Sequence, residues 1–171
     1  MTFASDTNPA RRRLGLYVLD GGTYLSSWFG KEDGAPPGSV TERDIVTGLS
    51  KPVGIVIVDD TLFISDQAAN RIVKVDWQAA CVASEPVQAS DTFATVDAPG
   101  LLAASPDGTL YTKCGAHGVC SFSKRGWPTV IASDLDAPRG VAVDVARKRL
   151  VAVDRASAKD GTSYLRVWPI R

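Results

Sequence analysis

The sequence lacks an excess of charge of either sign and has no long apolar run. Its 171 residues include 19 Lys and Arg against 19 Asp and Glu, so the formal net charge is zero. A neutral chain has no overall electrostatic attraction to nucleic acid or to anionic membranes, which argues against a nucleic-acid partner. No apolar run approaches the roughly 20 residues that a membrane-spanning helix needs. The sequence therefore predicts a globular chain without a membrane span.

Histidine and cysteine are also scarce. His117 is the only histidine, and the three cysteines are Cys81, Cys114 and Cys120. One histidine cannot build a His-based metal cluster. The chain also contains no Gly-x-Ser-x-Gly motif and no phosphate-binding glycine loop. These absences argue against serine-hydrolase and nucleotide chemistry, and we expect neither a metal nor a cofactor.

Cys114 and Cys120 flank a short Gly-rich segment that contains His117. A disulfide across this segment would stabilise the fold by about 2 kcal/mol, whereas the alternative is a pair of free thiols. A metal site is the third reading, but Cys-x₂-His-x₂-Cys supplies only three ligands at a spacing that zinc fingers do not use. A disulfide would favour a secreted or periplasmic location over a cytoplasmic one.

The chain repeats one short phrase four times. The phrase begins at residues 16, 62, 110 and 150, so the copies start 46, 48 and 40 residues apart; they are Leu16–Asp20, Leu62–Asp66, Leu110–Cys114 and Leu150–Asp154. A period of this length with several short β-branched runs per unit is typical of a β-propeller blade. A β-sandwich is the competing fold, but it does not require turn residues to recur at matching offsets.

Each full unit predicts four short strands in a fixed order. A glycine-led apolar strand comes first, at 54–58, 100–104 and 140–144, and the repeated phrase is the second strand. A third strand follows at 71–75, 118–122 and 165–168, and a fourth at 44–46, 92–96 and 129–132; a long insert occupies 77–90. The first copy begins at its second strand and the last ends after its third.

We therefore predict an all-β propeller of about four blades, with the first and last blades incomplete. Residues 14–171 would form this partial or small propeller, and residues 1–13 a flexible N-terminal segment. Four blades leave three interpretations: a piece of a larger ring, an arc completed by a second copy of the chain, or a small four-bladed ring.

The motif Lys51-Pro52-Val53-Gly54-Ile55, followed by the phrase at 62–66 and Ala69-Asn70-Arg71-Ile72-Val73, resembles an NHL repeat, and 137–144 resembles the start of another. The chain is similar to the senescence-marker and gluconolactonase-like propeller superfamily. In that family a central divalent metal is held by Asn, Asp and Glu side chains, often just before the glycine of an inner strand. Val53, Pro99 and Arg139 occupy those positions here, so this departure weighs against a metal-dependent lactonase.

We accordingly expect a non-catalytic binding or scaffold propeller of NHL type. Its partner would be an unidentified protein or small molecule, and it could form a homo-oligomer that completes the ring. The alternative is a propeller lactonase or lyase whose active site is completed by segments or subunits outside this chain.

Candidate ligand-binding residues lie in loops before the first strands or after the second strands, because such loops converge on one end of a propeller channel. They are Lys51, Asn70, Asp97, His117, Asp136, Arg139 and Arg155. A solvated rim is the alternative for each of them. Asp20, Asp66 and Asp154 recur at one offset, where a carboxylate can accept loop backbone N–H bonds. We assign these three to loop capping, because a catalytic group is rarely needed in every blade.

Overall fold

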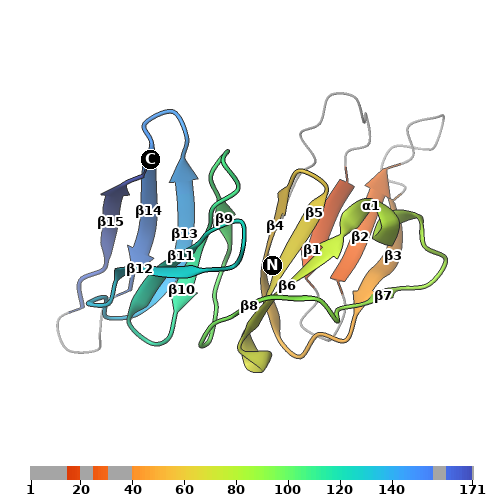
Figure 1. Ribbon diagram of the computed structural model, residues 1–171, viewed down its shortest axis with the longest axis horizontal. Coiled ribbons are helices and arrows are strands. Elements are labelled where there is room, and N and C mark those ends of the chain that lie inside the picture. Colours follow the sequence, from red (N-terminus) through yellow and green to blue (C-terminus); the bar gives the residue numbers. More distant parts are fainter. Residues whose placement is uncertain (1–14, 20–24, 31–39, 156–160, 171) are drawn as a thin grey trace.

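Four β-sheets follow one another along the chain (Figure 1). The computed structural model describes residues 15–19, 25–30, 40–155 and 161–170, and describes side chains from residue 44 onward. Sheet A contains β1 (Gly15–Leu19), β2 (Leu25–Gly30), β3 (Val40–Thr47) and β7 (Val87–Gln88). Sheet B contains β4 (Pro52–Val58), β5 (Thr61–Asp66), β6 (Arg71–Asp76) and β8 (Thr92–Thr95).

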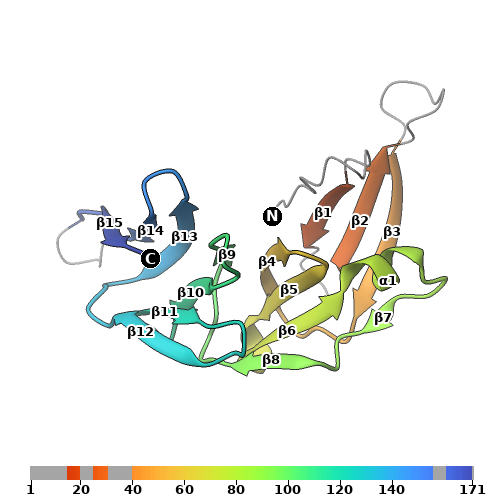
Figure 2. The same ribbon diagram turned by 45° about the horizontal axis from the view of Figure 1, so that its top comes forward.

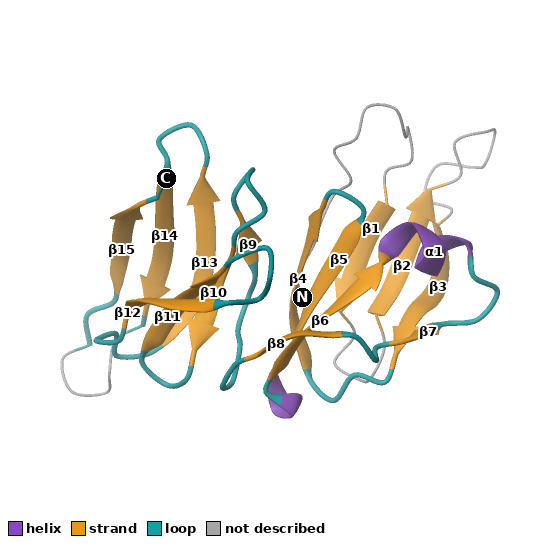
Figure 3. Cartoon of the chain, viewed as in Figure 1, coloured by secondary structure: helices purple, strands orange, loops and turns teal. Residues whose placement is uncertain are grey.

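The C-terminal half repeats this arrangement. Sheet C contains β9 (Ala103–Ala104), β10 (Leu110–Cys114), β11 (Gly118–Phe122) and β12 (Pro128–Ala132), and sheet D contains β13 (Pro138–Asp144), β14 (Arg149–Asp154) and β15 (Tyr164–Pro169). Helical structure is confined to η1 (Gln67–Ala69) and α1 (Trp77–Val82) in the described part of the chain (Figure 3). No helix within that part is long and apolar enough to span a membrane.

The sheets fan out along an arc in the order A, B, C, D (Figure 2). Strands β1, β4, β9 and β13 contact one another in that order on the inner side of the arc. Neighbouring strands within the sheets are antiparallel, apart from the short parallel contact of β7 with β3. The repeated phrase forms the second strand of sheets B, C and D (β5, β10 and β14), as the sequence predicts. Its first copy differs from the prediction, because β1 is the inner strand of sheet A and contacts β4. The all-β, blade-like prediction is confirmed.

Apolar side chains are buried between consecutive sheets. Ile45 of sheet A packs in one cluster with Leu62 and Ile64 of sheet B, and Phe63 of sheet B packs in another with Leu110 and Phe122 of sheet C. Tyr111 of sheet C joins Leu150 and Ala152 of sheet D in a third cluster. Alternate residues of the phrase therefore face opposite neighbours, because successive strand side chains point to opposite faces.

Gly54 allows two inner strands to approach closely. A methyl group placed on Gly54 would lie 2.7 Å from the Gly100 carbonyl oxygen and 2.8 Å from Leu101 Cα. Any larger residue would force the backbones of sheets B and C apart. The glycine that opens this repeat unit is thus explained by packing between blades.

Two segments differ from the repeat pattern. The insert 77–90 contains α1 and β7; α1 begins where the Asp76 carboxylate accepts a hydrogen bond from Ala79 N at 2.9 Å, which is an N-cap. In the third unit the predicted strand 100–104 is reduced to the two residues of β9. The reason is that Gly100 donates its N–H to Thr112 Oγ1 at 2.9 Å and its carbonyl accepts from Ser65 Oγ at 2.6 Å. Side chains thereby replace the strand partners.

Candidate functional site

The loops that enter the inner strands lie beside the hairpin loops that follow the second strands. Gln67 N donates to the Lys51 carbonyl at 2.8 Å, and Arg155 N donates to the Ala137 carbonyl at 3.1 Å. We call this end of the arc the strand-entry rim, defined by loops 48–51, 96–102 and 133–137 and hairpin loops 67–70 and 115–117. The candidate residues described by the structure lie in or beside these loops.

Asp66 fixes the loop before β4. Its side chain is fully buried, and one carboxylate oxygen accepts from Ser50 N at 2.9 Å and Lys51 N at 2.7 Å. The other oxygen accepts two hydrogen bonds from the Arg71 guanidinium, each 3.2 Å long. Arg71 also donates to the Gly48 carbonyl at 3.0 Å. The Asp66 carboxylate therefore fixes the end of this loop at residues 50 and 51, and the Arg71 guanidinium fixes its start at Gly48.

Asp154 makes a simpler contact at the same repeat position. It is 6% exposed and accepts from Ala137 N, just before β13, at 3.0 Å. Asp20 lies outside the described residues. Both described aspartates thus bond the backbone of a strand-entry loop and face away from bulk solvent.

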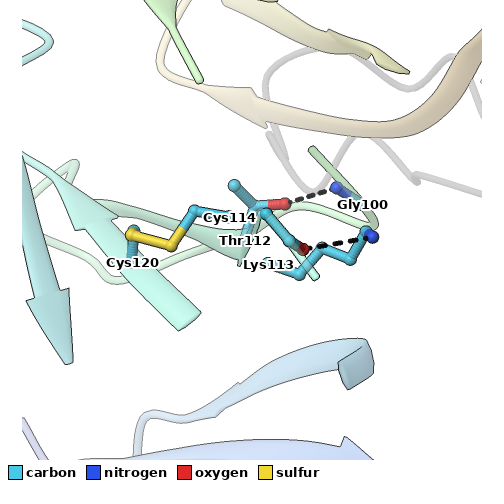
Figure 4. The surroundings of a disulfide bond; sticks show 6 residues. Gly100, Thr112, Lys113, Cys114 and Cys120 are labelled. Carbon is cyan, nitrogen blue, oxygen red and sulfur yellow. Dashed lines mark hydrogen bonds between the residues drawn. A yellow bond between two sulfur atoms is a disulfide. The ribbon is translucent and has the colours of Figure 1, made fainter. Parts of the chain in front are cut away.

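The third blade has Cys114 where the other blades have aspartate. Cys114 and Cys120 form a disulfide that joins β10 to β11 (Figure 4), with their Cα atoms 5.8 Å apart. A disulfide sulfur cannot replace a carboxylate as an acceptor for several N–H groups. The loop before β9 must therefore be held in another way.

Sheet B supplies the missing bonds. Asn70 Oδ1 accepts from Ala98 N at 2.9 Å, and Gln67 Nε2 donates to the Pro99 carbonyl at 3.0 Å. Ser65, which is fully buried, donates its hydroxyl to the Gly100 carbonyl. Three side chains of one blade thus position the entry loop of the next.

The backbone of this loop is strained. Ala98 has a φ of +42° and Asn70, which bonds it, has a φ of +51°. Such left-handed conformations are uncommon for residues other than glycine and cost on the order of 1–3 kcal/mol each where they are strained. Backbone strain of this kind concentrates at functional sites. In this loop it presents Asp97, whose side chain is exposed, at the rim.

Lys113 lies over the loop before β9. A methyl group on Gly100 would be 2.8 Å from Lys113 Cγ and 3.4 Å from the Arg139 carbonyl oxygen, so three elements meet at this glycine. The Lys113 ammonium makes one long hydrogen bond, 3.5 Å, to the Gly115 carbonyl (Figure 4). Gly115 N in turn donates to the Asp97 carbonyl at 2.6 Å. A half-buried ammonium and an exposed carboxylate therefore flank one short loop.

His117 has a fixed ring orientation. Its Nδ1 lies 2.7 Å from the Leu135 carbonyl and 3.1 Å from the Asp136 carbonyl. Because carbonyl oxygens only accept hydrogen bonds, Nδ1 carries the proton, and in the neutral ring Nε2 is an acceptor. The residue is exposed. The ring therefore offers a proton-accepting nitrogen at the rim.

The described residues of the rim do not form a divalent-metal site. Among the residues that the structure describes, no group of three His, Cys, Asp or Glu side chains is placed to hold an ion. Val53, Pro99 and Arg139, which stand before inner strands, supply no side-chain oxygen. The described residues therefore offer hydrogen-bond donors, cations and single carboxylates.

The remaining candidates lie at the same rim without being joined into one constellation. Lys51, Asp136, Arg139 and Arg155 are all exposed. Sequence reasoning did not select Ser65, Thr112 or Lys113, which carry or cover the loop before β9. The sequence offered one signal for Ser65 and Thr112: each is a polar residue inside an otherwise apolar strand. A buried hydroxyl needs a hydrogen-bond partner, so such a residue indicates a contact with a neighbouring segment.

The opposite rim carries a separate hollow. A cavity of about 300 Å³ is lined by 56–59, 104–106 and Val145. Next to it, hydrogen bonds from the Ser105 hydroxyl and Thr109 N–H lower the pKa of Asp107 below its usual 3.8. These bonds stabilise a turn.

Comparison with known proteins places the fold. No family model and no curated protein sequence matches the chain. Among solved structures it is similar to a gluconolactonase of Xanthomonas campestris, with a TM-score of 0.65 and 18% identity over 94% of this chain and 55% of that one. It is also similar to a luciferin-regenerating enzyme, with a TM-score of 0.62 and 12% identity over 96% of this chain and 60% of that one. The chain thus spans little more than half the length of either structure.

At these identities the likeness establishes the fold alone, an all-β propeller-like arrangement of sheets. It also corrects one expectation. The sequence suggested a non-catalytic scaffold, whereas both similar structures are enzymes. The reasoning failed because it equated missing metal ligands with missing catalysis, although the chain matches only part of each structure.

Proposed function

We propose that this chain forms part of a propeller enzyme that hydrolyses a cyclic ester, a lactone, to the open hydroxy acid. The observation that carries the proposal is the match of 94% of the chain to a gluconolactonase at a TM-score of 0.65. The geometry of the strand-entry rim supports it, because cations and a proton acceptor lie there beside a strained loop. We also propose that the repeat is of NHL type, on the motif around Gly54.

Lactone hydrolysis makes two demands that rim residues can meet. Water attacks the carbonyl carbon, so negative charge develops on the carbonyl oxygen and the water loses a proton. Lys113 is the group we assign to the developing charge, because its ammonium makes a long hydrogen bond of 3.5 Å to the Gly115 carbonyl and can turn toward a substrate oxygen. His117 Nε2 is the acceptor we assign to the proton, because its Nδ1 proton is fixed by two carbonyls.

The described residues do not complete a metal site, so no step is derived through a metal. The remaining groups of the active site come from segments or subunits outside the described residues. The substrate class is a small polar lactone such as the sugar lactone that the similar enzyme's name implies.

The proposal is tested by following acid release from D-glucono-δ-lactone against the spontaneous rate. Lys113→Met keeps the stem over Gly100 and removes the charge. It should lower kcat/KM about tenfold to a hundredfold, the usual cost of losing a charged hydrogen bond at the reacting oxygen. Lys124→Met is the matched control, because Lys124 packs against Gly108 at the opposite rim. No acceleration by the unmodified chain, or equal losses in both variants, would refute the assignment.

A further inference from the structure

Two cationic residues from neighbouring sheets border Gly100 at the strand-entry rim. A methyl group placed on Gly100 would lie 2.8 Å from Lys113 Cγ, in β10 of sheet C, and 3.4 Å from the Arg139 carbonyl oxygen, in β13 of sheet D. Strand β13 contacts both β9 and β10. Lys113 and Arg139 therefore belong to one local site, although they lie far apart in the sequence.

The fold leaves the Arg139 guanidinium without an anionic partner in the described part of the chain. The ion pairs of that part are formed by Arg71, Lys74, Arg147 and Arg166, and the Arg139 side chain is exposed. A guanidinium binds a phosphate or a carboxylate through two parallel hydrogen bonds, a geometry that the compact lysine ammonium does not provide. Arg139 can therefore hold an anionic group that comes from solution.

A second guanidinium lies at the same end of sheet D. Pro138 pairs with Asp154 between β13 and β14, so Arg139 and Arg155 follow paired residues on neighbouring strands. Arg155 is also exposed. Asp154 lies between these positions in the sheet, but it is 6% exposed and its carboxylate accepts a hydrogen bond from Ala137 N. Its oxygen atoms are thus used by the fold, while the two guanidinium groups face solvent.

The carboxylates at the rim leave this positive charge largely unpaired. Asp66 is paired with Arg71, and Asp134 with Arg166. The rim residues that are exposed or half-buried and form no ion pair with a described residue are the cations Lys51, Lys113, Arg139 and Arg155 and the carboxylates Asp97 and Asp136. Cations outnumber carboxylates in this set. A local excess of one sign attracts ligands of the other sign even in a chain of zero net charge.

We propose that the strand-entry rim selects an anionic lactone, a sugar lactone that carries a phosphate or a carboxylate group. Arg139 binds that group, Arg155 adds to the attraction, and Lys113 faces the carbonyl oxygen that gains charge. Leu101 is 38% exposed, and its Cδ1 would lie 3.4 Å from a methyl group on Gly140, so it offers an apolar surface beside Arg139 to the face of a sugar ring. The inference rests on the proposed lactone hydrolysis and names its substrate class.

The first test compares kcat/KM for neutral D-glucono-δ-lactone with that for its 6-phosphate and for D-glucaro-δ-lactone, which carries a carboxylate. At least one charged lactone should react about tenfold better than the neutral one, because one charged hydrogen bond contributes about that factor. The lactone that gains identifies the anionic group. Added salt should reduce the preference, because the guanidinium is exposed.

Arg139→Gln should abolish this preference, because glutamine keeps a polar side chain and removes the charge. Arg149→Gln is the matched control: Arg149 is an exposed arginine at the far end of the same hairpin, paired with Asp144 in the register, so the preference should persist. Equal kcat/KM values for the three lactones, or the same loss of preference in both variants, would overturn the inference.

A binding measurement separates this inference from the proposed reaction. Isothermal titration with glucose, glucose 6-phosphate and glucuronate requires no turnover, since none of these sugars is a lactone. At least one of the two anions should bind about tenfold more tightly than glucose, and Arg139→Gln should remove that difference. Anion binding without lactone hydrolysis would support the anion site and refute the reaction. Lactone hydrolysis with no difference between the anions and glucose would refute the anion site and leave the reaction intact.

Discussion

Replacing Asp66 by alanine should destabilise the fold more than replacing either Asp154 or Asp91. The substitution removes the acceptor for Ser50 N and Lys51 N and leaves the Arg71 guanidinium without its carboxylate. The two N–H bonds are charge-assisted, but their donors lie in a loop that water can reach, so each contributes about 1 kcal/mol. The ion pair adds about another 1 kcal/mol, because the arginine side chain is 23% exposed and is partly screened. The expected loss is about 3 kcal/mol in the free energy of unfolding.

The other two aspartates provide an internal scale for this measurement. Asp154→Ala removes one backbone bond at the equivalent position and should cost about 1 kcal/mol. Asp91→Ala removes an exposed ion pair with Lys74 and should change stability by less than about 0.5 kcal/mol. Urea denaturation followed by far-ultraviolet circular dichroism gives all three values. If Asp66→Ala costs no more than Asp91→Ala, the capping argument is wrong.

Three further outcomes are expected. Gly54→Ala should lower the unfolding free energy by about 2 kcal/mol or more in the same urea assay, because its methyl group would lie 2.7 Å from backbone of sheet C; an unchanged midpoint would contradict the close approach. Joint Cys114→Ser and Cys120→Ser substitution should cost about 2 kcal/mol, the closure entropy of a short ring, and the loss should match that of the parent chain under reductant. Asp107 has a lowered pKa, so its ionised form stabilises the fold above its ordinary pKa, and this stability is lost as pH falls through the folded value. Asp107→Asn should therefore flatten the stability curve below about pH 4; a curve parallel to that of the parent chain would refute this.

The architecture could be predicted from the sequence because one pattern controls it. The phrase that starts at Leu62, Leu110 and Leu150 places a fully buried leucine at the same point of each of these three blades. Alternation along a strand then assigns each neighbouring residue to one inter-blade core. The strand order within sheets B, C and D follows directly from this periodicity and from the turn residues.

The exceptions arose where a local contact competes with the repeat. Asp76 caps a helix in the insert, and a two-turn helix leaves little periodic signal. Strand 100–104 looks apolar in sequence, yet Gly100 is bonded by Ser65 and Thr112, which lie 35 and 12 residues away. The strand propensity of residues 100–104 does not depend on partners so far away in the sequence, so it could not predict the shortened strand. The position of Lys113 over this glycine depends on the same contacts.

The functional prediction had a different weakness. The residue types at Val53, Pro99 and Arg139 predict that the inner-strand entries carry no side-chain metal ligands, but they say nothing of catalysis by other groups. The fold likeness to two enzymes supplied that information. A site assembled from several blades cannot be recognised from single positions, because the distances between them depend on the curvature of the arc.

The bonds from Ser65, Gln67 and Asn70 to the entry of the following blade limit how this repeat can be rearranged. A blade that carries cysteine in place of the usual acid folds properly only downstream of a neighbour that provides these three groups. If the unit with the disulfide were duplicated, deleted or grafted by itself, its entry loop would lose the hydrogen bonds from the preceding unit. Engineers who wish to lengthen or shuffle the array should move the second and third units together.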